Sequence, residues 1–118
     1  VQDIEWSQKG VYYVADCWVN GSELDVWFDA NANWIMTEME IFREQLPAAV
    51  NTAYEESGYG DWVIDNLTKL TFPHKSEEFV FEVQRGAQER ALYYSAYGGL
   101  LLEKDITDAD DTHWPDVE

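Results

Sequence analysis

Apolar and polar residues alternate in short runs along most of the chain, which predicts a sheet of antiparallel strands. The clearest run is 11–19, whose odd-numbered positions are all apolar or aromatic. A period of two indicates a strand with one buried face, because successive side chains of a strand point to opposite sides. We expect strands at 2–7, 11–19, 23–29, 34–41, 62–72, 78–84, 88–95 and 100–106.

One segment has the period of a helix instead. Pro47 suits the first helical position, because the N–H that it lacks would have no partner there. We therefore expect a helix at 47–57, which the glycines of 58–60 end. Its apolar stripe, spaced i, i+4, i+7 and i+8, is Leu46, Val50, Ala53 and Tyr54.

The strand pattern occurs twice. When the first third of the chain is shifted by 66 positions, residue classes coincide: Tyr13 falls on Phe79 and Phe28 on Tyr94. Repetition of residue class at a fixed spacing is typical of a duplicated structural unit. We therefore expect one α+β domain over 1–118, built from tandem helix-plus-four-strand repeats in a largely antiparallel sheet with helix on one face.

The two expected repeats differ in completeness. The first covers 1–41 and the second 42–106, and an acidic tail follows at 107–118. In the second repeat the helix precedes the strands, so the matching helix of the first repeat would lie upstream of Val1. We expect this chain to be the remainder of a longer product that carries this second helix.

The chain is strongly acidic. It has 24 Asp and Glu residues against seven Lys and Arg, and its formal net charge is −17. Such a charge repels nucleic acid and anionic membranes and attracts basic proteins or divalent cations, and it also favours solubility. We therefore expect no nucleic-acid partner. We also expect no membrane insertion, because no apolar stretch approaches the roughly 20 residues that span a bilayer.

Three segments together resemble a bacterial family. They are the run DVWFDANANWIMTEMEI at 25–41, LPAAV at 46–50 and SGYGDW at 57–62. These segments resemble the PepSY-like periplasmic domains of bacteria, which are also described as similar to beta-lactamase inhibitor protein. The resemblance implies tandem helix-plus-strand repeats, helices on one sheet face, and a periplasmic or secreted location. It brings no catalytic motif, and it suggests an analogy to inhibitor modules.

No catalytic or metal-binding motif stands out among the candidate residues, although carboxylates are numerous. Asp29 to Glu40 has oxygen side chains at positions 1, 3, 5 and 12 of a calcium loop. However, Trp34 replaces the required glycine, and a strand at 34–41 would carry Glu40 roughly 20 Å from the turn. Neither His74 nor His113 belongs to a zinc pattern, and we expect Cys17 to be a buried apolar side chain. We therefore predict no enzyme, no cofactor and no metal site.

Aromatic and acidic side chains share one predicted sheet face. If Tyr13 and Cys17 face the helix, alternation directs a mixed group of rings and carboxylates to the opposite face, which we expect to be bare. Large rings favour partner recognition, although they could also pack across the strands or against a second copy. These predicted partner-binding residues are Tyr12, Asp16, Trp18, Asp25 and Trp27.

Two functions are compatible with this surface. The first is an exported, non-enzymatic module that binds a protein or peptide, with inhibition as one form of that binding. The second is a cation-binding or structural envelope protein. The sequence leaves the identity of the partner and the oligomeric state open.

Overall fold

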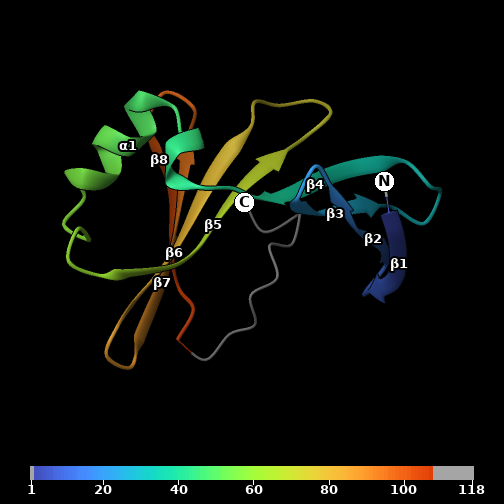
Figure 1. The fold of residues 1–118 in the computed structure, drawn as a ribbon, viewed down its shortest axis with the longest axis horizontal. Coiled ribbons are helices and arrows are strands. Elements are labelled where there is room, and N and C mark those ends of the chain that lie inside the picture. Colours follow the sequence, from blue (N-terminus) through green and yellow to red (C-terminus); the bar gives the residue numbers. More distant parts are fainter. Residues whose placement is uncertain (1, 108–118) are drawn as a thin grey trace.

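Eight strands form a single antiparallel sheet in which the spatial order follows the chain order. The computed structural model describes residues 2–107. Between β4 and β5 the chain forms a short 3₁₀ helix, η1 (Arg43–Gln45), and the helix α1 (Ala48–Glu55), as Figure 1 shows. The strands are β1 (Gln2–Lys9), β2 (Tyr12–Val19), β3 (Ser22–Phe28), β4 (Trp34–Glu40), β5 (Val63–Thr71), β6 (Glu78–Arg85), β7 (Gln88–Ser95) and β8 (Leu100–Asp105).

The predicted α+β class and the antiparallel sheet are confirmed. The first and last residue of each expected strand lie within two positions of those observed. The helix prediction needs a correction at both ends. Pro47 is the N-cap with an extended ψ of 145°, not the first helical residue, and the helix ends at Glu55. The Pro47 carbonyl still accepts the first helical hydrogen bonds, from the N–H groups of Val50 and Asn51.

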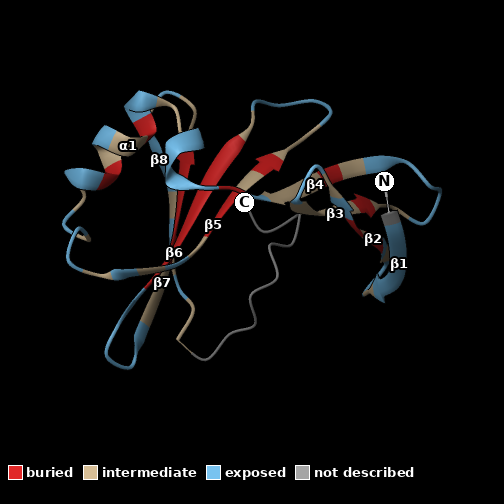
Figure 2. Ribbon diagram, viewed as in Figure 1, coloured by how far each residue is buried: buried red, intermediate tan, exposed pale blue. Residues whose placement is uncertain are grey.

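Helix α1 packs on one face of the sheet, which we call the helix side. Figure 1 places α1 against the half that carries β5–β8, and Figure 2 shows buried residues concentrated there. The Tyr54 ring stacks on Phe81, with centroids 4.2 Å apart and planes 2° from parallel. This helix-side core consists of Ile41, Val50, Tyr54, Leu67, Phe79, Phe81, Val83, Leu92 and Tyr94.

The turn between β7 and β8 touches the helix, and a glycine permits this approach. Gly98 has a φ of +88°, which side chains rarely tolerate. A Cβ at this position would lie 2.7 Å from the carbonyl oxygen of Ala49 in α1. The turn could not lie this close to the helix with a larger residue unless the backbone shifted.

The opposite face, the far side, has a core of its own. Seven residues from β2 to β7 form one buried cluster there, with Leu102 and Ile106 packed against it. The expectation that this face is bare is therefore wrong, because aliphatic and aromatic side chains on adjacent strands cover one another. This far-side core consists of Val14, Trp27, Met36, Leu70, Val80, Ala91 and Tyr93.

No helix covers the helix side of β1–β4 in the described part of the chain. Trp6 is 63% exposed and Tyr13 44%, although the Trp6 ring contacts Phe28 at 5.9 Å. Cys17 is buried on this face, which confirms its predicted role as an apolar side chain. Burial on this face of β1–β3 therefore depends mainly on neighbouring strands, whereas Met39 of β4 packs against the helix-side core.

Some predictions fall beyond the described residues. His113, and the tail apart from its first residue Thr107, lie outside 2–107. Within 2–107, α1 is too short to cross a membrane.

Candidate functional site

Four carboxylates lie side by side on the far side of β1–β4. The strand register pairs Glu5 with Asp16, Asp16 with Asp25, and Asp25 with Glu38. Directly paired residues on one face have Cβ atoms about 5 Å apart, and like charges at such positions destabilise a sheet. We call this line of residues the acidic row: Glu5, Asp16, Asp25 and Glu38.

Asp25 shows the electrostatic effect of this arrangement. Burial, followed by the negative charges of Glu38, Asp16 and Glu23, raises the pKa of the Asp25 carboxyl to about 6. The protonated carboxyl can also share a hydrogen bond with Asp16. Asp25 therefore changes charge near neutral pH, which is unusual for an aspartate.

Asp16 lies at the centre of the same cluster. Its Oδ1 atom is buried and, among the described residues, accepts no hydrogen bond from an N–H or neutral O–H group. A proton on Asp25 would supply such a donor within the protein. The negative charges of the row, not this buried atom, give the surface its attraction for a positively charged group.

Trp27 contacts Glu38, the last residue of the acidic row, but its own side chain is buried. Its indole N–H donates a hydrogen bond of 2.7 Å to Oε1 of Glu38. The side chain is 0% exposed, within the far-side core. Trp27 therefore positions Glu38, and we do not include it among the residues that could contact a partner.

The remaining predicted site residues lie at different places on the far side. Trp18 is 53% exposed and is paired with Glu23, beside the acidic row. Tyr12 is half-buried, and its ring meets Trp27 edge-on at 5.6 Å. The fold thus brings Trp18 to the surface next to Asp16 and Asp25, whereas Tyr12 belongs to the margin of the far-side core.

In the turn that resembles a calcium loop, the carboxylate of Asp29 is already hydrogen-bonded within the turn. The Asp29 carboxylate accepts hydrogen bonds from the backbone N–H groups of Asn31 and Asn33 and from the Asn33 side chain. These bonds lower the pKa of Asp29. Glu40 is the last residue of β4, far from this turn. Across residues 2–107, no group of three or more His, Cys, Asp or Glu side chains is arranged to hold a metal ion.

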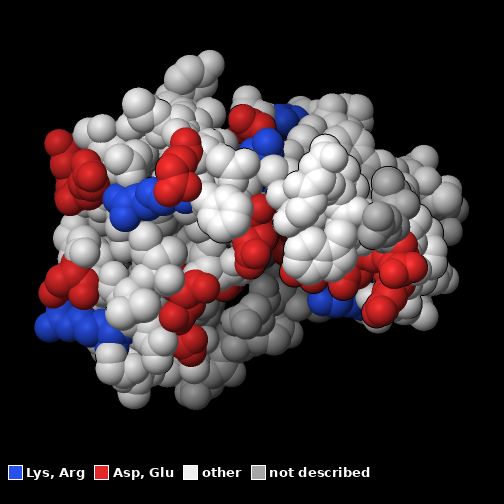
Figure 3. All heavy atoms as spheres, in the orientation of Figure 1, with Lys and Arg blue, Asp and Glu red and all other residues white. Residues whose placement is uncertain are grey.

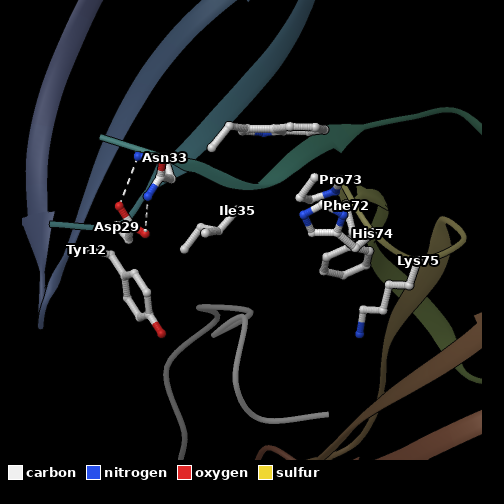
Figure 4. Close-up of a pocket in the computed structure, with 9 residues that line it drawn as sticks. Tyr12, Asp29, Asn33, Ile35, Phe72, Pro73, His74 and Lys75 are labelled. Carbon is white, nitrogen blue, oxygen red and sulfur yellow. Dashed lines mark hydrogen bonds between the residues drawn. The ribbon is translucent and has the colours of Figure 1, made fainter. Parts of the chain in front are cut away.

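A cavity of about 830 Å³ opens where the two halves of the molecule meet. Figure 4 shows its walls, which come from the β3–β4 turn on one side and the β5–β6 loop on the other. Sequence reasoning treated these segments only as turns. Their spacing along the chain gives no sign that they meet, although each combines rings with polar groups. The lining residues are Tyr12, Asp29, Asn33, Trp34, Ile35, Phe72, Pro73, His74 and Lys75.

Comparison with known proteins gives a consistent family. The family model described as "Putative beta-lactamase-inhibitor-like, PepSY-like" matches residues 11–102. A BLIP-like protein from Bacteroides fragilis has a similar crystal structure, with 56% identity and a TM-score of 0.88. The alignment covers 97% of this chain and 82% of that one.

Two further crystal structures are similar. A DUF2874 family protein from Bacteroides ovatus is 31% identical, with a TM-score of 0.88, over 92% of this chain and 79% of that one. One from Bacteroides eggerthii, described among "putative periplasmic proteins", is 31% identical with a TM-score of 0.90, over 93% and 81%. A comparison with curated protein sequences finds no match. On these residues and this fold, the chain belongs to the beta-lactamase-inhibitor-like, PepSY-like family.

Proposed function

We propose that this protein is a non-enzymatic module that binds a basic protein or peptide through the far side of β1–β4. The contact surface consists of Asp16, Asp25 and the exposed ring of Trp18. The single observation that carries the proposal is the placement of like charges on three adjacent strands beside this ring. A cationic partner would relieve that repulsion, and an exposed tryptophan suits the centre of an interface.

The second half of the sheet supports this interpretation. At a shift of 66 positions, Asp16, Asp25 and Glu38 correspond to Glu82, Ala91 and Lys104. These three residues are also cross-strand neighbours, yet their row contains one acid, one alanine and one base. The same pairing pattern therefore forms without a line of carboxylates, so the fold does not require the acidic row.

We also propose that the sheet arose from two tandem units. Supporting this, the pair Tyr13–Phe28 recurs as Phe79–Tyr94 at the same shift. The pair Trp27–Met36 recurs in the same way as Tyr93–Leu102. The shared register gives a reason to compare equivalent positions in the two halves.

Two features of the relatives support a binding role outside the cytoplasm. The family is described as inhibitor-like, which favours holding another protein over transforming a substrate. One relative is described as periplasmic, and we propose the same or a secreted location for this chain. Fractionation of cells that express the full-length protein with an epitope tag would test the location. Recovery in the cytoplasmic fraction would contradict it.

The binding proposal can be tested with a cationic probe. The double variant Asp16→Asn/Asp25→Asn should weaken binding of a lysine-rich peptide about tenfold, measured by calorimetry at low salt. The matched control Glu44→Gln/Glu56→Gln removes the same charge from exposed positions near α1. Equal weakening by both double variants would mean that only net charge matters, and the proposal would fail.

Calcium provides the test of the alternative. In the same instrument, calcium should bind no tighter than the millimolar range, and the row variants should leave that binding unchanged. Tight calcium binding that the row variants abolish would replace the peptide proposal with the cation-binding function.

A further inference from the structure

Strand β1 is an edge of the sheet. It pairs with β2 on one side, and no other described strand lies along its outer side. In an antiparallel sheet, alternate residues of an edge strand direct their N–H and C=O groups outward. Such an edge can accept another strand. Figure 2 shows most of β1 exposed, and the exposed residues are 3–8.

Residues Glu5 to Lys9 of β1 are regular enough to pair with an added strand. A bulge interrupts the pairing between Gln2 and Glu5, where Asp3 has a φ of 40°. From Glu5 to Lys9 each residue has a partner on β2 in unbroken register. This stretch contains no proline and no bulge, which are among the devices that usually block an edge.

The two faces of this edge differ in chemistry. On the helix side, Trp6 is exposed beside the apolar residues of β2. On the far side, Glu5 is the outermost carboxylate of the acidic row, and the chain carries a net charge of −17. A strand added beside Glu5 would place alternate side chains against an apolar surface and against an acidic one, whereas Lys9 puts a positive charge on the far side at the end of β1.

We propose that β1 binds an extended peptide segment by strand addition, and that this segment alternates apolar and basic residues. Its apolar side chains pack beside Trp6, and its basic side chains extend over Glu5 towards Asp16. This inference rests on the proposed function, because it uses the same acidic row, and it specifies the form of the partner. The recognition mode is backbone pairing, with side chains supplying specificity.

The other edge of the sheet fits such a peptide less well. In β8, Lys104 lies over the Tyr93 ring at 4.9 Å, as Lys9 of β1 lies over the Trp27 ring at 5.7 Å, so each edge has one lysine on the far side and the difference lies in the carboxylates. Asp105 pairs with Arg90 at 3.4 Å, and Glu103 accepts a hydrogen bond from Tyr59. The carboxylates of β8 therefore already have partners in the second half of the sheet. We assign peptide binding to β1 for this reason.

A short peptide that alternates valine with lysine, with both ends blocked, is the appropriate probe. Calorimetry should detect its binding to the full chain. The same peptide N-methylated at alternate residues on its pairing edge should bind about tenfold more weakly or worse, because several backbone hydrogen bonds are lost together. A third peptide, with the same composition arranged in two blocks, should also bind weakly.

Hydrogen exchange and two variants locate the site. The alternating peptide should slow exchange of alternate amides in residues 5–9 and leave those of β8 unchanged. Trp6→Ser and Glu5→Gln should each weaken binding several-fold, whereas Glu44→Gln should not. Both positions are exposed, so the variants should fold, which far-UV circular dichroism would check.

The outcomes separate this inference from the proposed function. If the N-methylated peptide binds as tightly as the parent, or β1 gains no protection, strand addition is wrong. Weakening by Asp16→Asn/Asp25→Asn in that case would leave the acidic row as a binding surface. If neither the row variants nor the β1 variants change binding, both proposals fail.

Discussion

The two halves of the sheet carry the same pattern of residues but bury it differently. On the helix side of β6, Phe79, Phe81 and Val83 are fully buried, because α1 covers them. At equivalent positions on β2, Tyr13 is 44% exposed, and the buried neighbours are the small residues Ala15 and Cys17. Alternation thus determines which face a side chain occupies, whereas a covering layer determines whether a large one is buried.

The far side shows a second contrast. Figure 3 shows acidic side chains on both halves of the molecule, yet only β1–β4 align them across adjacent strands. In the second half the equivalent row mixes an acid, an alanine and a base. Like charges in register are therefore a property of one half, which is why we assign the binding surface there.

The largest expected effect tests the difference between covered and uncovered faces. Phe81→Ala should lower the free energy of unfolding by about 3–5 kcal/mol, because it removes the ring that stacks on Tyr54. Trp6→Ala, on the same side of the uncovered half, should cost less than about 1 kcal/mol. Urea unfolding of both variants would measure this. Similar losses would mean that Trp6 is part of a core.

A second pair of variants tests the far side, where the strand alternation places two tryptophans, Trp18 and Trp27, on the same face. Trp27→Leu should lower the free energy of unfolding by about 2–4 kcal/mol, because Trp27 is fully buried and donates to Glu38. Trp18→Leu should stay within about 0.5 kcal/mol of the parent, because Trp18 is half exposed. A large loss from Trp18→Leu would remove this ring from the proposed surface.

Equivalent turns in the two halves offer a third comparison. Gly98→Ala should cost about 1–3 kcal/mol, from a positive φ and a clash with α1. Its counterpart at a shift of 66 is Ala32, which has a φ of 66° in a turn that no helix approaches. Ala32→Gly should stabilise the protein by up to about 1 kcal/mol. Thermal unfolding would measure both, and a neutral Gly98→Ala would show that the turn can move away from α1.

The smallest effect concerns the titration of the acidic row. Because the pKa of Asp25 is raised to about 6, the Asp25 carboxyl stays protonated to a higher pH in the folded state than in the unfolded state. The resulting stabilisation is complete below the ordinary aspartate range and is lost as the pH rises through 6. Asp25→Asn should remove this pH dependence and make the protein more stable than the parent at neutral pH.

Unfolding curves for parent and Asp25→Asn across this range would check the direction. Binding of a basic peptide should show the opposite trend, strengthening as Asp25 ionises. If the stability of the parent rises between pH 4 and pH 6 while that of Asp25→Asn does not, the raised pKa of Asp25 would be refuted.

Much of the fold could be predicted from local patterns. The period of two located the strands, and the helix stripe with its flanking glycines located α1, because side-chain direction follows from backbone geometry one residue at a time. The sheet face of Asp16, Trp18 and Asp25 followed from the same alternation. The same patterns did not determine where the helix begins, since Pro47 can begin a helix as its cap or as its first residue.

The sequence alone determined which side of each strand a residue occupies, because alternation is set by the chain itself. The tertiary structure decided which of those residues meet. Trp18 and Trp27 lie on the same face of the sheet, but only Trp27 has Val14 and Met36 as neighbours in a buried cluster. Likewise, the cavity joins two loops far apart in the chain. Such contacts depend on strand register and on the layers above and below, which no local pattern encodes.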